Sequence, residues 1–106
     1  MAVTFYVANN QDEIYQEKYG VYLEDEVHEC LWKQAQGTRY DLNILIDLDP
    51  YRDKQFNVLK LKRLKRVSEL LIRDYDESEV IEFAEGLYGL CVEALNTNRL
   101  AFALGD

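Results

Sequence analysis

The chain begins and ends with short segments whose apolar pattern is typical of strands. Near the start, AVTFYVA would place Val3, Phe5 and Val7 on one face of an extended backbone. The polar stretch that follows, residues 9–20, predicts a loop or one frayed helical turn. The last residues, RLAFALGD, predict a second strand. We expect these two terminal strands to pair with each other.

Apolar side chains at helical spacing predict two helices in the middle of the chain. YLEDEVHECLWKQAQG, residues 22–37, has acidic residues in its first turn and Gly37 to end it. The next helix is expected to begin at Asn57, with Asn57 or Asp53 as its cap. The inward-facing stripes would be Leu23, Val27, Cys30 or Leu31 and Gln34 in the first helix, and Leu61, Leu64, Val67 or Ser68 and Leu71 in the second.

The strongest helical pattern is DYDESEVIEFAEGLYGLCVEALNTN, residues 74–98. Asp76 or Ser78 is the expected cap. Gly86 and Gly89 lie inside this helix, where glycine is less favourable than alanine, and the close approach of another backbone would explain both. The inward-facing residues would be Val80, Phe83, Leu87, Leu90 or Cys91, and Ala94.

The segment YDLNILIDLDP fits two elements. Alternating apolar residues across residues 42–48 suit a strand, whereas Leu42, Leu45 and Leu48 also fit a short helix. Pro50 disfavours the helical conformation of the residue before it, so either element must end there. The next stretch, DPYRDKQ, predicts a turn whose aspartates could accept hydrogen bonds from nearby backbone amides.

These elements predict an α+β fold that is mainly α, with three principal helices and short terminal β-strands in one domain, residues 1–106. The length suits a single core, and 48% hydrophobic with 30% charged residues is typical of globular proteins. No apolar run reaches the roughly 18–20 residues that cross a bilayer, and the first residues do not resemble a secretory signal. Cys30 and Cys91 have no disulfide framework, so we expect buried, reduced thiols and a cytoplasmic protein.

The net charge of −8 is unevenly distributed along the chain. Residues 1–51 hold ten acids and three bases, residues 52–76 hold four acids and eight bases, and residues 77–106 hold six acids and one base. A field this negative repels nucleic acid and anionic membranes at long range. We therefore expect a basic protein partner, with no nucleic acid and no membrane.

Residues that could carry catalysis or bind a metal are few. His28 is the only histidine, and its spacing to Cys30 matches no zinc pattern. Asp47, Asp49 and Asp53 lack the glycine and the final glutamate of a calcium loop. Neither serine lies in a glycine elbow, and there is no glycine-rich phosphate loop. The sequence predicts no enzyme, no catalytic residues, no metal and no cofactor.

A run of basic residues follows the expected turn. Lys60, Lys62, Arg63, Lys65 and Arg66 fall within seven positions of an otherwise acidic chain. Such a run could bind phosphates, but opposite a leucine stripe it is usually the solvated side of an amphipathic helix. We expect a solvated or salt-bridged surface.

Two acidic clusters lie where helices are expected to begin. Carboxylates there are favoured by the helix dipole and add solubility, which can account for both clusters without any function. The functional interpretation is an inhibitor surface that faces a cationic active site, because complementary charge speeds association. The candidate interface residues are Glu24, Asp25, Glu26 and Glu29 in the first cluster and Glu77, Glu79, Glu82 and Glu85 in the second.

One segment resembles a known family. LIDLDPYRDKQFNVLKLKRLKRVSELL is similar to a segment of small bacterial immunity proteins of polymorphic-toxin and contact-dependent growth inhibition systems. In that family an Asp-Pro-Tyr turn leads through a Phe-Asn pair into an amphipathic helix, and the chain ends in Gly-Asp. The matching positions, about a quarter of the chain and its terminus, are at Asp49–Tyr51, Phe56–Asn57 and Gly105–Asp106.

The resemblance implies an immunity protein, which binds a cognate toxin domain and occludes its active site without catalysis. The toxin implied is a nuclease, which we expect to be basic. Asp49 and Pro50 would set the approach of the helix, and Asn57 would satisfy its first amides. The family supplies no interface positions, so the acidic candidates rest on charge alone. The alternatives are a non-catalytic regulatory or scaffold subunit of a cytoplasmic complex, and a nucleic-acid binder that uses residues 60–66.

Overall fold

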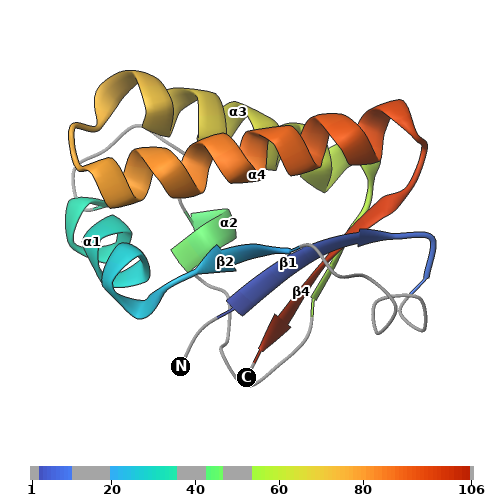
Figure 1. Cartoon of the computed structure of the whole chain (residues 1–106), viewed down its shortest axis with the longest axis horizontal. Coiled ribbons are helices and arrows are strands. Elements are labelled where there is room, and N and C mark those ends of the chain that lie inside the picture. The colour runs from blue at the N-terminus through green and yellow to red at the C-terminus, as the bar shows by residue number, and fades with distance from the viewer. Residues whose placement is uncertain (1–2, 11–19, 36–42, 47–53, 106) are drawn as a thin grey trace.

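Helices α3 (Val58–Asp74) and α4 (Ser78–Asn96) lie across one face of an antiparallel sheet (Figure 1). The computed structural model describes residues 3–10, 20–35, 43–46 and 54–105. The predicted α+β fold with three principal helices is confirmed, and the sheet contains two further strands. The elements are β1 (Val3–Ala8), β2 (Val21–Leu23), α1 (Asp25–Ala35), α2 (Asn43–Ile46), β3 (Lys54–Phe56), α3 (Val58–Asp74), α4 (Ser78–Asn96) and β4 (Leu100–Gly105).

The two terminal strands form the centre of the sheet, whose order is β2-β1-β4-β3. They pair antiparallel from Val3 opposite Gly105 to Ala8 opposite Leu100, as the sequence predicts. The alternation of β1 is also confirmed, because Val3, Phe5 and Val7 are buried in the main core. On the opposite face of the sheet, Ala8 and Phe102 form a smaller buried cluster.

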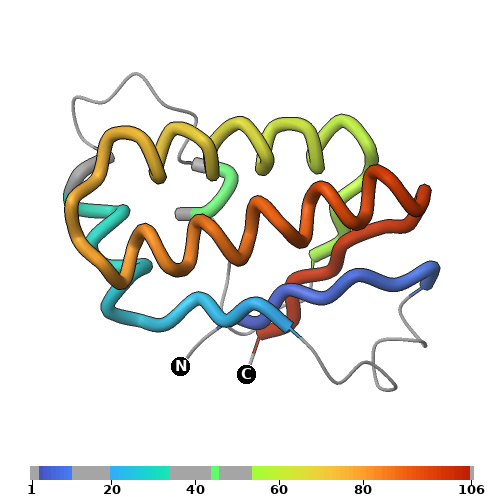
Figure 2. Tube along the Cα trace, turned by 45° about the horizontal axis from the view of Figure 1, so that its top comes forward, coloured from blue at the N-terminus to red at the C-terminus, as the bar shows by residue number. Residues whose placement is uncertain are grey.

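The main core lies between the sheet and the two long helices, which run side by side in both views (Figures 1 and 2). Phe5 is at its centre, with its ring centroid 5.9 Å from that of Phe56 and 6.2 Å from that of Phe83. Ser68 is buried among leucines, and its hydroxyl donates to the Leu64 carbonyl at 2.8 Å. The predicted stripes are confirmed: α3 buries Leu61, Leu64, Val67, Ser68 and Leu71, and α4 buries Val80, Phe83, Ala84, Leu87, Leu90, Cys91 and Ala94.

The start of α3 is capped as predicted. The Asn57 side-chain oxygen accepts a 3.0 Å hydrogen bond from the Lys60 amide, which satisfies one of the free N–H groups of the first turn. The prediction of Asp76 or Ser78 as the cap of α4 is wrong. Ser78 is already the first helical residue, so Glu77 occupies the cap position. The Glu77 side chain makes no capping hydrogen bond.

The end of α4 turns the chain back into the sheet. Asn98 takes the left-handed conformation, with φ of 56°, and the Arg99 amide donates to the Ala94 carbonyl at 2.9 Å. This is the Schellman arrangement, with asparagine in the position that glycine usually occupies. It directs the chain into β4, immediately beside β1.

Two short strands correct the sequence-based boundaries. Tyr22 and Leu23 belong to β2 rather than to the first helix, which begins at Asp25. Val21 and Leu23 are buried in the main core, on a strand that pairs with β1 and packs against α4. Lys54 and Gln55, predicted within a turn, belong to β3 and pair with β4. Strands of three residues are stabilised mainly by pairing with their neighbours. They are also too short for their own sequence to establish a period.

The described part of the ambiguous segment, Asn43–Ile46, is helical, which decides between the two alternatives there. Other predictions fall outside the described residues. These concern the loop at 11–19, the cap at Gly37, the turn at 47–53 and the terminal Asp106.

The cysteine prediction is correct for one residue. Cys91 is fully buried, whereas Cys30 is half-buried because Leu31 takes the inward position on α1. Neither cysteine forms a disulfide. The prediction that another backbone approaches closely at Gly86 and Gly89 is wrong. A Cβ at Gly86 would meet only Val21 side-chain atoms, at 3.4 and 3.5 Å, and one at Gly89 would meet nothing within 4 Å. In the described part of the chain, no helix has the length and apolar character needed to span a membrane.

Candidate functional site

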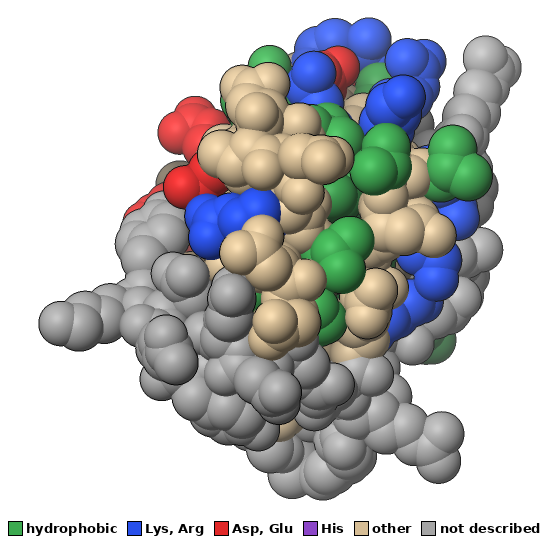
Figure 3. Space-filling view, turned by 90° about the vertical axis from the view of Figure 1, so that its right-hand side faces the viewer, with side chains coloured by type: hydrophobic (Ala, Val, Ile, Leu, Met, Phe, Trp, Pro, Cys, Tyr) green, Lys and Arg blue, Asp and Glu red, His purple; other side chains and the backbone are tan. Residues whose placement is uncertain are grey.

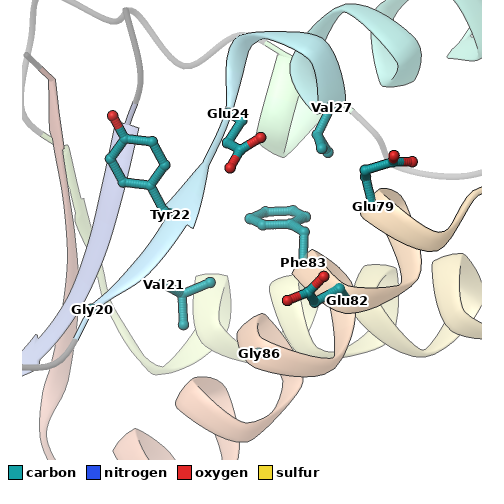
Figure 4. Close-up of a pocket in the computed structure, with 9 residues that line it drawn as sticks. All are labelled: Gly20, Val21, Tyr22, Glu24, Val27, Glu79, Glu82, Phe83 and Gly86. Atoms are coloured by element: carbon teal, nitrogen blue, oxygen red, sulfur yellow. The ribbon is translucent and has the colours of Figure 1, made fainter.

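A cavity of about 320 Å³ lies where β2, α1 and α4 meet (Figure 4). The pairing of β2 with β1 brings the start of α1 beside the first turns of α4, although these helices are far apart in the sequence. The cavity therefore joins the two acidic clusters that the sequence singled out. Its lining residues are Gly20, Val21, Tyr22, Glu24, Val27, Glu79, Glu82, Phe83 and Gly86.

The floor of this cavity is apolar and its rim is acidic. Val21, Val27 and Phe83 are 6%, 4% and 5% exposed, so core packing fixes their positions. The rim carries three exposed carboxylates, those of Glu24, Glu79 and Glu82. Figure 4 shows the Phe83 ring between Glu24 and Glu82, with Glu79 on the side of Val27. The Tyr22 ring points away from the space above Phe83.

Two smaller hollows continue this acidic lining along α1. Glu24, Val27 and Glu79 line both the cavity and the next hollow, and Cys30 lines that hollow and the third. Six of the eight candidate residues line the three hollows, and we call these six the acidic surface: Glu24, Glu26, Glu29, Glu77, Glu79 and Glu82.

The other two candidates, Asp25 and Glu85, are exposed on the same helices but do not line these hollows.

The carboxylates of the acidic surface differ in how far cations in the described part of the chain compensate them. Glu29 forms an i,i+4 ion pair with Lys33 at 3.2 Å, in which both side chains are about two-thirds exposed. Within the described ranges, no lysine or arginine forms an ion pair with Glu24, Glu79 or Glu82. The carboxylates around the cavity are therefore available to an external cation.

The basic residues of α3 form a separate feature. Lys62, Arg63 and Arg66 are exposed, as expected for the solvated side of an amphipathic helix. Lys65 is half-buried, with its ammonium 5.8 Å from the centroid of the Tyr88 ring. Figure 3 shows basic side chains around exposed hydrophobic ones on the face to the right in Figure 1. The hydrophobic side chains exposed on the first turn of α3 are Val58 and Leu59.

The Cys91 thiol and the Tyr75 hydroxyl are titratable groups on buried residues of the main core. Burial raises the pKa of the Cys91 thiol to about 12, with Lys65 acting in the opposite direction, so the thiol is protonated at neutral pH. Burial, with smaller contributions from Cys30 and Glu77, also raises the pKa of Tyr75. The Tyr75 hydroxyl is buried and has no hydrogen-bond partner among the residues that the structure describes. Among the described residues, no three His, Cys, Asp or Glu side chains are placed to hold a metal ion.

The acidic rim was identified from the sequence, but the apolar floor was not. Val21 lies in a strand that was not predicted, and Phe83 was expected only as a core residue. Apolar Val21 and Leu23 on either side of Tyr22 suggest alternation, but three residues are too few to establish a period from the sequence alone.

Comparison with known proteins adds no relative, because no family model, curated protein or solved structure matches this chain.

Proposed function

We propose that this protein is a cytoplasmic, non-catalytic immunity protein that neutralises a cognate bacterial toxin by covering its active site. The observation that carries the proposal is the convergence of carboxylates from α1 and α4 on one acidic surface. The toxin proposed is a nuclease with a basic active site, which agrees with the resemblance of the segment around Asp49–Asn57 to immunity proteins.

Electrostatics explains why such a surface suits a nuclease inhibitor. A nuclease must attract phosphates, so the surface around its active site is positively charged. An acidic protein competes for the same surface, and complementary charge raises the rate of encounter while like charge suppresses wrong partners. The net charge of −8 would also keep the inhibitor away from the nucleic acid itself.

The structure favours a preorganised surface over a flexible acidic tail. Glu26 directly precedes buried Val27, and Glu82 directly precedes buried Phe83. The helices therefore hold these carboxylates in place before any partner arrives. Preorganisation lowers the entropy lost on binding.

Binding kinetics provide the test, once a toxin-bearing neighbouring gene product has been shown to co-purify with this protein. Charge reversal of Glu24, Asp25 and Glu26 together should slow association about tenfold or more at low salt and flatten its salt dependence. The matched variant reverses Lys62, Lys65 and Arg66 on α3 and should change the association rate much less. Circular dichroism would check that both variants fold.

Rescue of toxin-expressing cells is the second readout. The α3 variant should protect cells, and the acidic-surface variant should protect them poorly. If the α3 variant loses rescue while the acidic variant keeps it, the interface is the basic helix and the target surface is acidic. If no neighbouring product binds, a regulatory or scaffold subunit becomes the better explanation.

A further inference from the structure

We infer that the cavity between β2, α1 and α4 binds an arginine side chain presented by the partner protein. The inference rests on the proposed function for the identity of that partner. The preference of the cavity for arginine, however, follows from its apolar floor, its acidic rim and the space between them. This preference can be tested without the partner.

The floor suits the stem and the flat end of arginine. Val21 and Val27 provide apolar surface for the three methylene groups of the stem, which arginine side chains commonly bury while the charged group stays near water. Phe83 adds an aromatic ring that lines the same space. A guanidinium group stacks on aromatic rings and is attracted by their electrons when it lies within about 6 Å of the ring centre.

The rim suits the charge and the geometry of the guanidinium. Glu24 approaches from the start of α1, and Glu79 and Glu82 approach from α4, so acceptors lie on more than one side (Figure 4). Arginine has five N–H donors fixed in a plane and can donate to several carboxylates at once. A lysine ammonium is a compact, strongly hydrated charge and would use this spread of acceptors less well.

The absence of a side chain at Gly86 keeps the cavity open beside α4. A Cβ built there would lie 3.4 Å from a methyl group of Val21, in the gap between α4 and β2. Glycine is an unfavourable residue inside a helix, yet here it leaves space next to the floor and rim. Gly86→Ala should therefore narrow the cavity without changing any charge.

The direct test titrates N-acetyl-arginine amide into the full ¹⁵N-labelled chain and follows the amide resonances by NMR. Saturable shifts should be concentrated at Gly20, Val21 and Gly86. N-acetyl-lysine amide should bind more weakly, and N-acetyl-citrulline amide, which keeps the shape of arginine without its charge, should produce no saturable shifts. Equal binding of all three probes, or shifts spread over the whole acidic surface, would overturn the inference.

Two double variants with the same change in charge show whether arginine binds at the cavity or elsewhere on the acidic protein. Glu79→Gln with Glu82→Gln should weaken arginine binding about tenfold, because two acceptors of charge-assisted hydrogen bonds are lost. Glu69→Gln with Glu93→Gln removes two exposed carboxylates that do not line the cavity and should leave binding nearly unchanged. Equal losses in both variants would mean non-specific attraction. Gly86→Ala should also weaken binding, and unchanged binding would contradict the proposed position of the side chain.

The outcomes separate this inference from the proposed function. If the arginine probe binds as expected and no toxin partner is found, the cavity stands and the immunity function fails. If a toxin binds and Glu79→Gln with Glu82→Gln leaves its affinity unchanged, the immunity function stands and the cavity inference fails.

Discussion

Gly89 offers a quantitative test of the structure that needs no knowledge of the partner. It lies in the middle of α4 on an exposed face, and an added Cβ would meet no atom within 4 Å. Gly89→Ala should therefore bring the full gain in helix propensity with no steric penalty. Since glycine is about 0.8–1.0 kcal/mol less favourable than alanine inside a helix, we expect stabilisation of about 1 kcal/mol.

Thermal and urea unfolding followed by circular dichroism would measure the change. With an unfolding entropy of about 2.1 cal/mol/K per residue, a gain of about 1 kcal/mol raises the Tm of a 106-residue chain by about 4 °C. The urea midpoint should rise while the slope of the free energy against urea stays the same, because the surface exposed on unfolding is unchanged.

Two other glycines provide matched controls. Gly86→Ala should also stabilise α4, because its new methyl group would only reach ordinary contact with Val21 at 3.4 Å. Gly20→Ala should destabilise by about 1–3 kcal/mol, the usual cost of overpacking. Its Cβ would lie 2.8 Å from a methyl of Thr4, 2.9 Å from the Tyr6 ring and 3.1 Å from the Phe5 carbonyl oxygen.

The order of these three stabilities is the critical result. A neutral or destabilised Gly89→Ala variant would refute the placement of Gly89 on an open face of α4. A stabilised Gly20→Ala variant would refute the close packing of Gly20 against β1.

Three further predictions concern single buried or capping groups. Tyr75→Phe should stabilise the protein by about 1 kcal/mol in urea unfolding, because it removes a buried hydroxyl without a partner; a loss of stability would show that the hydroxyl is bonded. Asn57→Ala should lower the free energy of unfolding by about 0.5–2 kcal/mol through loss of the bond to the Lys60 amide, and an unchanged value would contradict that cap. The Cys91 thiol, with a pKa raised from 9.0 to about 12, should react slowly with a thiol reagent at pH 8, and fast reaction would contradict its burial. Because the unfolded chain loses that proton first, the stability from Cys91 should be complete below pH 9 and decline between pH 9 and 12 in unfolding measured against pH.

The long helices could be predicted because their own sequences carry the signal. In α3 and α4 the apolar side chains recur at helical spacing over 17 and 19 residues, so neighbouring elements need not be known. The three-residue strands β2 and β3 are different. Their stability comes from pairing with β1 and β4, which lie far away in the sequence, and three residues cannot establish a period.

The candidate site, like the fold, was predictable only in the parts that lie within the long helices. Runs of carboxylates at the starts of α1 and α4 are visible in the sequence, but their convergence depends on β2, which the sequence did not predict. The cavity floor was missed for the same reason. From the sequence, Phe83 is an ordinary core residue and Val21 falls between two predicted elements. Only the contact of α4 with β2 places both at the floor of one cavity.

The helix dipole accounts for only part of the acidic surface. The helix dipole favours acids in a first turn, which accounts for Asp25 and Glu79, but Glu82 lies beyond the first turn of α4 and faces Glu24 across the cavity. Carboxylates that share one rim repel each other, and no described lysine or arginine forms an ion pair with Glu24, Glu79 or Glu82, so this repulsion opposes folding. A bound guanidinium group would attract these carboxylates, so their contribution to the free energy of the complex would become favourable. The same carboxylates that weaken the isolated protein would then strengthen its complex.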